Sequence, residues 1–445
     1  MNKPITLQTR REFLRTGILG GALSWTVPAF LSNTFSALQA EAADSATQTA
    51  TGKNSSILVV LQMAGGNDGL NTVVPYANDY YFQARRRIAQ PAKSVLKLND
   101  EVGLHQGLTG FKDLYDAGHL SVIQGVGYPN PNRSHFRSTE IWQTASDEDK
   151  VESYGWLGRY FDNACSGADP EVGVNIGRQT PQAFSAKTPT GISLENPQNY
   201  RFMAGRRMAD GEMNGVEKSF RELNQPAQDD GGADNPGATI GAISGSIAHH
   251  GSPLDFLERT ALDAEVSSDK ILAITRRVEN QATYPTSQLA ASLKLVAKLI
   301  AGGLPTRIFY VSQGGYDTHT NQVGQQERLL RDLGDSVNSF VADLKAQGNF
   351  QRVMLMTFSE FGRRVAENAN GGTDHGAAAP MFVVGNKVKA GLHGKYPSLA
   401  AADLFNGDLR YNVDFRSVYA GILEEWLNTK SEPILGRKFS PLPLV

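Results

Sequence analysis

Short apolar runs that each lead into a polar turn constrain the fold of this chain more than any other feature. Residues 57–61 read Ile-Leu-Val-Val-Leu, and similar runs occupy residues 306–311 and 352–357. Continuous apolar, β-branched runs of this length are typical of strands that a parallel sheet buries on both faces. Helical patterning follows several runs, most clearly at about residues 323–347. The alternation predicts an α/β fold with a doubly wound, mainly parallel central sheet.

Acidic side chains and histidines gather in the turns of this pattern. Three of the eight histidines stand in compact clusters, which are Ser134-His135, Asp317-Thr318-His319 and Asp374-His375. Asp68 and Glu360 also come shortly after predicted strands. The carboxyl ends of parallel strands open onto a shared crevice, so we expect these groups to converge there although they are distant in the chain.

The residue types in these clusters favour a metal site. Imidazole and carboxylate together suit Zn²⁺, Mn²⁺ or Fe better than Ca²⁺ or Mg²⁺. Two divalent ions about 3.5–4 Å apart can hold a phosphoryl group or a similar oxyanion, and such a centre needs several convergent ligands. The candidate ligands are Asp68, Asp317, His319, Glu360, Asp374 and His375. The alternative roles are local, with Asp68 satisfying backbone donors in its turn and Glu360 pairing with Arg363 or Arg364.

Ser134 is the candidate nucleophile. It precedes a predicted helix at about residues 135–145, where free N–H groups and the helix dipole stabilise an anion. Arg133 and Arg137 are close enough in sequence to contact that anion, and we assign Arg137 to the catalytic set. The alternative is that Ser134 serves only as the N-cap of the helix, which is the commonest role of a serine in this position.

The first residues predict export. They contain a twin-arginine motif, Thr9-Arg10-Arg11-Glu12-Phe13-Leu14-Arg15. A moderately apolar stretch at about 17–31 follows, shorter than the ~20 residues that a membrane span needs, and Ala40-Glu41-Ala42 offers a cleavage site. We expect residues 1–42 to be a signal read by the twin-arginine export machinery. The product would be periplasmic or extracellular, with no stable membrane span after cleavage; an uncleaved anchor is the alternative.

Composition narrows the remaining possibilities. The formal net charge is −2 with no basic excess, so we expect no nucleic-acid partner. Cys165 is the only cysteine, which excludes an internal disulfide and a thiolate-rich metal site. Residues 43–56 are rich in Ala, Ser and Thr and are expected to form a flexible tether. Residues 57–445 are expected to form a single α/β domain, with a loop-rich insertion at about 197–252.

Several motifs, taken in order, resemble the bacterial family called domain of unknown function 1501. They are Gly65 to Asn71, Asn132 to Phe136, Gly315 to His319, Ser359 to Arg363, Gly372 to Gly376 and Asp414 to Ser417. The family is grouped with the alkaline phosphatase superfamily. The resemblance therefore implies a three-layer α/β/α sandwich with two metal ions across the site.

The resemblance also implies roles for single residues. Asp68 resembles the first-strand metal ligand, Ser134 resembles the nucleophile that caps a helix, and Asp317 with His319 resembles the Asp/His pair of one metal. Glu360 stands where relatives often carry an Asp-His pair. Ser134 lies outside any Cys/Ser-x-Pro-x-Arg motif, which disfavours the sulfatases that depend on formylglycine.

Taken together, the sequence predicts an exported metal-dependent hydrolase. Its substrate would be a small phosphate ester or a related anionic ester, attacked by the serine at a site with two metal ions. The competing hypothesis is a non-catalytic exported binding or scaffold protein that keeps the same fold, because a fold alone does not imply an activity.

Overall fold

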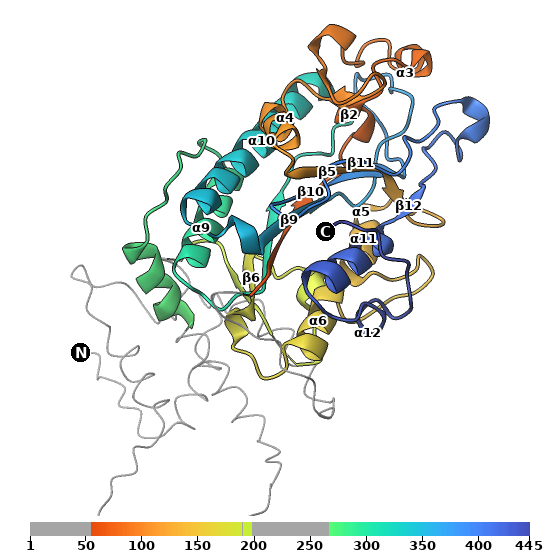
Figure 1. The fold of residues 1–445 in the computed structure, drawn as a ribbon. Helices are drawn as coiled ribbons and strands as arrows, with labels where there is room; N and C mark the ends of the chain where they lie inside the picture. The colour runs from red at the N-terminus through yellow and green to blue at the C-terminus, as the bar shows by residue number, and fades with distance from the viewer. Residues whose placement is uncertain (1–54, 189, 198–266) are drawn as a thin grey trace, which may run out of the picture.

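The computed structural model describes residues 55–188, 190–197 and 267–445 (Figure 1). The expected signal at residues 1–42, nearly all of the expected tether and almost all of the insertion at 197–252 lie outside these residues. In the three described ranges, no helix is both long enough and apolar enough to cross a membrane.

A nine-stranded sheet runs through the described part of the chain. Its central strand, β1 (Ile57–Met63), lies between β8 (Ile308–Gln313) and β9 (Val353–Phe358) and is parallel to both. Beyond β8, the sheet continues in the same direction with β6 (Gly173–Ile176) and β7 (Ile192–Leu194). The strands predicted at 57–61, 306–311 and 352–357 are therefore neighbours at the centre of one sheet.

The other half of the sheet contains a single reversal among its described strands. β10 (Ala379–Gly385) pairs antiparallel with both β9 and β5 (Leu120–Gly127). β11 (Gly391–His393) and β12 (Val413–Asp414) then pair in parallel with β5. The prediction of a mainly parallel central sheet is confirmed. The reversal arises because β9 and β10 are joined by a loop, residues 359–378, in place of a helical crossover.

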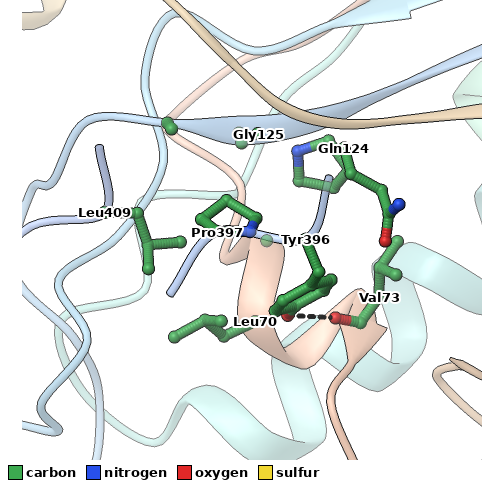
Figure 2. A pocket seen from close by; sticks show the side chains of 11 residues that line it. Leu70, Val73, Gln124, Gly125, Tyr396, Pro397 and Leu409 are labelled. Carbon is green, nitrogen blue, oxygen red and sulfur yellow. Dashed lines mark hydrogen bonds between the residues drawn. The ribbon is translucent and has the colours of Figure 1, made fainter. Parts of the chain in front are cut away.

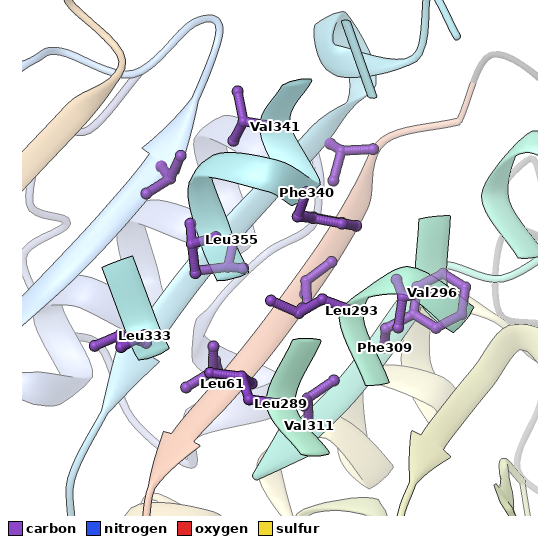
Figure 3. Close-up of a cluster of buried hydrophobic side chains, with 14 of the residues drawn as sticks. Leu61, Leu289, Leu293, Val296, Phe309, Val311, Leu333, Phe340, Val341 and Leu355 are labelled. Carbon is purple, nitrogen blue, oxygen red and sulfur yellow. The ribbon is translucent and has the colours of Figure 1, made fainter. Parts of the chain in front are cut away.

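Helices cover one face of the sheet. α4 (Thr109–Asp116), α9 (Gln288–Ala301) and α10 (Gln322–Ala346) pack there against alternate residues of β1, β8 and β9. Figure 3 shows part of this core. The residues labelled there are Leu61, Leu289, Leu293, Val296, Phe309, Val311, Leu333, Phe340, Val341 and Leu355. The helix predicted at 323–347 is α10.

The opposite face is covered by α5 (His135–Thr144), α6 (Trp156–Ala164), α11 (Phe415–Gly421) and α12 (Glu432–Leu435). The intervening residues of β1, which are Leu58 and Val60, belong to this second core. Both faces of β1 are therefore covered, and the predicted three-layer α/β/α architecture is confirmed (Figure 1). The apolar run of β1 follows from this burial, because neither face of the strand meets water.

The remaining elements are short. A three-stranded sheet contains β2 (Val73–Val74), β3 (Leu96–Lys97) and β4 (Gly103–Leu104), and α3 (Asp79–Ala84) lies between β2 and β3 in the chain. Residues 267–277 are helical. The 3-10 helices are η1 (Gly69–Asn71), η2 (Ala92–Ser94), η3 (Pro170–Val172), η4 (Gln182–Phe184), η5 (Phe350–Arg352) and η6 (Ala401–Asp403). η7 (Ile422–Trp426) is a π-helical turn after α11.

Candidate metal centre

The topology brings four segments together beyond the carboxyl ends of the central strands. They are the turn after β1, the turn after β8, the start of α5 and the loop at 359–378. Because β10 runs back along β9, this loop begins and ends at the same edge of the sheet. A helical crossover would instead have carried the chain to the opposite edge. The reversal of β10 therefore keeps the whole loop beside the turns of β1 and β8.

One buried guanidinium, that of Arg363, ties these segments to each other. Its side chain is 0% exposed. It donates hydrogen bonds to the backbone carbonyls of Gly65, Gly66, Tyr316 and Thr373 and to Oδ1 of Asp317. Its Nη2 lies 2.7 Å from that carboxylate oxygen. The fork of five N–H groups on an arginine suits this role, because a lysine has only three donors on one atom.

Three imidazoles converge on the carboxylate that Arg363 holds. Nε2 of His319 lies 3.1 Å from Oδ1 of Asp317, and Nε2 of His375 lies 3.2 Å from the same oxygen. Nε2 of His135 lies 3.4 Å from the other oxygen, Oδ2. The Nε2 atoms of His319 and His375 are 2.9 Å apart. The three rings therefore present the same nitrogen to one place.

The opposite nitrogen of each ring faces an oxygen that orients it. The Nδ1 contacts are 2.9 Å from His135 to Oε1 of Glu360, 2.8 Å from His375 to the carbonyl of Arg133, and 3.3 Å from His319 to Oδ1 of Asp374. A proton on each Nδ1 would be donated to that oxygen, which leaves Nε2 with a free lone pair. This is the arrangement by which proteins orient histidine ligands toward a metal.

The ionisation states in the cluster favour cation binding. Burial raises the pKa of Asp317, but the hydrogen bond and charge of Arg363 outweigh burial and hold that pKa at about 2. The amide of Asn368 lowers the pKa of Asp374. Burial lowers the pKa of His375. Near neutral pH the carboxylates are thus charged and His375 is neutral, and these are the forms that bind a metal ion.

The spacing of the donor atoms fits one ion. A tetrahedral ion with bonds of about 2.0–2.1 Å separates its ligand atoms by roughly 3.3 Å. The separations around Asp317 are 3.1, 3.2 and 3.4 Å. Nε2 of His135 is also buried without a hydrogen-bond partner, although its lone pair needs one. His135, Asp317 and His375 lie close enough together to share an ion, and His319 adjoins two of them.

Asp68 does not join this cluster. Its carboxylate pairs with Arg85 at 2.5 Å, and both side chains are almost fully buried at 1% and 0% exposed. The amide of Gln322 also donates to Asp68, while Thr318 and Thr373 donate to the carbonyl oxygen of the same amide. Asp68 is therefore linked through Gln322 to the two segments that carry Asp317 and Asp374. Within the described ranges, the acidic and histidine side chains gather into one group able to hold an ion.

Two further expected ligands lie behind the imidazoles. Glu360 is nearly buried, and it accepts hydrogen bonds from the ring of His135 and from the N–H of Gly65. Asp374 is half exposed and touches His319 at Nδ1, not at Nε2. Glu360 thus orients the ring of His135, and Asp374 orients the ring of His319. The alternative role of Glu360, an ion pair with Arg363 or Arg364, does not describe these contacts, because its carboxylate faces the ring of His135 and the N–H of Gly65.

Ser134 lies at the N-cap of α5, next to His135, but its hydroxyl does not form the capping hydrogen bond. The side chain is exposed, so the simple N-cap role does not describe it. Arg137 is turned away from the cluster. Its guanidinium pairs with Glu140 at 2.8 Å and donates to the carbonyls of residues 147, 148 and 150. The expected contact between Arg137 and an anion at this site does not fit that position.

Sequence reasoning missed His135 as a ligand and Arg363 as the residue that organises the site. A signal for His135 was present, because the serine and the histidine are adjacent and the first turn of α5 places both at one end of the helix. Arg363 ends one of the motifs that carry the family resemblance, but the motif does not show which groups its side chain binds. Its role depends on carbonyls from three segments that lie far apart in the chain.

The structure also contains a small apolar crevice (Figure 2). Leu70, Tyr396, Pro397 and Leu409 line it, and the hydroxyl of Tyr396 donates to the carbonyl of Val73 at 2.8 Å. None of the residues that line it is a candidate ligand. The crevice is therefore separate from the candidate ligands.

The sequence matches the model of a family described as "Protein of unknown function (DUF1501)" over residues 55–428. A comparison with curated proteins found no match. Solved structures share the fold at low identity.

Three of these structures illustrate the likeness. Ps i-CgsB, in complex with k-i-k-neocarrahexaose, has 10% identity and a TM-score of 0.31 over 86% of this chain and 73% of its own. An alkaline phosphatase superfamily protein from Vibrio parahaemolyticus has 8% identity and a TM-score of 0.34 over 93% and 78%. The alkaline phosphatase from the Antarctic bacterium TAB5 has 12% identity and a TM-score of 0.29 over 76% and 92%. All three TM-scores lie below 0.5, too low to assign an activity.

We predict that Arg363→Lys lowers the free energy of unfolding by about 3 kcal/mol, because the lysine leaves several buried carbonyls without a donor. Urea denaturation measures the loss. Arg331→Lys is the matched control, since Arg331 is 61% exposed and pairs with Glu327 on the surface of α10. The control should change the free energy by less than about 0.5 kcal/mol. Equal effects of the two substitutions would show that Arg363 does not organise the site.

Proposed function

The chain belongs to the DUF1501 family, and we propose that it is an exported metal-dependent hydrolase of phosphate esters or related anionic esters. The proposed centre holds one divalent ion, bound by Nε2 of His135, His319 and His375 and by the carboxylate of Asp317. Nitrogen and oxygen ligands of this kind suit Zn²⁺, Mn²⁺ or Fe.

One observation carries this proposal, and it is the common orientation of the three imidazoles. Each ring turns Nε2 toward Asp317 and Nδ1 toward an oxygen acceptor. Histidines that only form hydrogen bonds within a fold have no reason to share this orientation, whereas histidines that bind a metal ion require it. A second ion was expected from the sequence. A single ion is proposed here because Asp68, the expected first-strand ligand, pairs with Arg85 and lies outside the group of His135, Asp317 and His375.

The bound ion would supply a Lewis acid that polarises the ester anion and favours a nucleophile beside it. Ser134 is the nucleophile in this proposal. Its exposed hydroxyl stands at the start of α5, where the free N–H groups of the first turn face an incoming anion. Oγ of Ser134 forms a bond to the central atom of the ester and the bond to the alcohol oxygen breaks, while the proton of the serine hydroxyl passes through solvent water to that alcohol oxygen. Water then cleaves the serine ester and returns the free hydroxyl.

The remaining residues of the cluster act as orienting groups in this proposal. Glu360 holds the ring of His135, and through it the first turn of α5 that carries Ser134. Arg363 holds Asp317 in the charged form, which keeps the ligand ready for a cation. These contacts fix the nucleophile and the ligands before substrate arrives, which is how such sites limit the cost of reorganisation.

Metal content is the first test. We predict about one divalent ion per chain in the native protein, measured by mass spectrometry after dialysis. His375→Ala should lose most of the ion, since it removes a ligand nitrogen. His393→Ala is the control, because Nε2 of His393 bonds to the carbonyl of Lys389 at 2.6 Å in β11. Two ions per chain would contradict the single-ion centre, and no ion with no turnover would favour the scaffold hypothesis.

The nucleophile is tested by Ser134→Ala. We predict that hydrolysis of generic phosphate mono- and diesters falls by on the order of 10³-fold or more, because the covalent route is lost. Metal content should stay at the native level, since the hydroxyl is not among the proposed ligands. Ser94→Ala, at a half-buried serine in η2, should keep full turnover. Retained turnover in Ser134→Ala would rule out this nucleophile.

Export rests on the twin-arginine motif, and it is tested by replacing Arg10 and Arg11 together with lysine. We predict that the precursor then stays in the cytoplasm, because the export machinery reads the arginine pair. Arg15→Lys, five residues along in the same motif, is the control and should still be exported. Normal periplasmic recovery of the double variant, measured by cell fractionation and immunoblotting, would remove the proposed route.

A further inference from the structure

A tight hairpin stands beside the metal centre. Asn406 and Gly407 have φ values of 53° and 85°, and Phe405 and Asp408 exchange two backbone hydrogen bonds of 3.0 Å. Asn-Gly is the residue pair that two-residue hairpin turns of this kind prefer, because both central positions need positive φ. The turn therefore fixes the position of Asp408 closely.

Asp408 is buried under two arginines. Its side chain is 0% exposed, whereas those of Arg133 and Arg364 are each 38% exposed. Nε of Arg133 donates to Oδ2 of the carboxylate at 2.8 Å, and Nε of Arg364 donates to Oδ1 at 3.4 Å. Arg364 also donates to the carbonyl of Asn406 at 2.6 Å. One carboxylate thus holds two guanidinium groups in fixed orientation at the surface.

The two arginines carry more positive charge than is needed to neutralise the carboxylate of Asp408. Two positive charges face one negative charge, and Nη1 of each arginine has no hydrogen-bond partner among the residues that the structure describes. The charge of Arg364 lowers the pKa of Asp374, but Oδ1 of that carboxylate is already engaged by Asn368 and His319. The free guanidinium edges therefore have donors available for an oxyanion.

The arginine pair lies next to the metal centre without belonging to it. The carbonyl of Arg133 accepts from Nδ1 of His375 at 2.8 Å, and the N–H of Arg364 donates to the carbonyl of Asp374 at 3.0 Å. Both main chains therefore touch the ligand-bearing segments, but both side chains turn to the hairpin. An anion on these guanidinium groups would sit beside the ion and not on it.

We propose that Arg133 and Arg364, held by Asp408, form a second anion site, so that the preferred substrate is an anionic ester that carries another anionic group. The inference rests on the proposed function in placing the reacting ester at the metal centre. The second group is recognised by its oxyanion chemistry, and a carboxylate, a sulfate or a phosphate would each satisfy it. Arg133 and Arg364 are specificity-determining residues in this scheme.

The test uses probes that bind without turnover. Phenylphosphonate and its 3- and 4-carboxyl derivatives are titrated by calorimetry into the metal-loaded native protein. We expect at least one carboxyl derivative to bind about twofold to fivefold more tightly than phenylphosphonate, the range for ion pairs of partly exposed groups. In Arg133→Gln and in Arg364→Gln, the ratio of the two affinities should fall to about one.

Arg178→Gln is the matched control. Arg178 is also an exposed arginine bound to one carboxylate, at 2.8 Å from Glu195, and this variant should keep the native ratio. Thermal unfolding of each variant checks that it is folded, and if one arginine variant does not fold, the other carries the test. Equal affinities for all three phosphonates in the native protein would overturn the second anion site and leave the proposed function standing. A carboxyl preference without metal or hydrolysis would overturn the proposed function alone.

Discussion

The buried guanidinium of Arg363 is the interaction on which the site depends. A charge without water around it is costly unless every donor has a partner, and here the partners come from the turns after β1 and β8 and from the loop that follows β9. The energetic requirement of one side chain thus fixes the relative positions of three segments. Asp317 receives its orientation and its charge from the same contact. The imidazoles are then arranged around a carboxylate that Arg363 holds in place.

Arg85 is a second buried arginine that joins the turn after β1 to the loop after β9. It binds Asp68 and Asn71 and the carbonyls of residues 364 and 365, so the backbone of the two residues after Arg363 is held as well. Two buried arginines therefore support one exposed ligand cluster. Asp68, the acidic residue in the turn after β1, does not face the cluster because its carboxylate compensates the charge of Arg85.

The sequence alone predicted those strands and turn residues that a short, local pattern of side chains identifies. The apolar runs identified β1, β8 and β9, and the polar turns after them identified Asp317, His319 and His375 as neighbours. The reversal of β10 has no such signal, because an apolar run carries no direction. Arg137 was misplaced because closeness in sequence does not fix the direction of a side chain. It lies on α5 near Ser134 but turns to the carbonyls of a loop.

The distance along the chain between Arg363 and its partners has a consequence for folding. Arg363 and Gly66 are 297 residues apart in sequence, yet they hydrogen-bond inside the same site. β1 is synthesised early and is apolar on both faces, but its neighbours β8 and β9 are made only near the end. Contacts of such long range form slowly, and a waiting apolar strand is open to wrong pairing. The last third of the polypeptide must therefore leave the ribosome before the candidate ligands can come together.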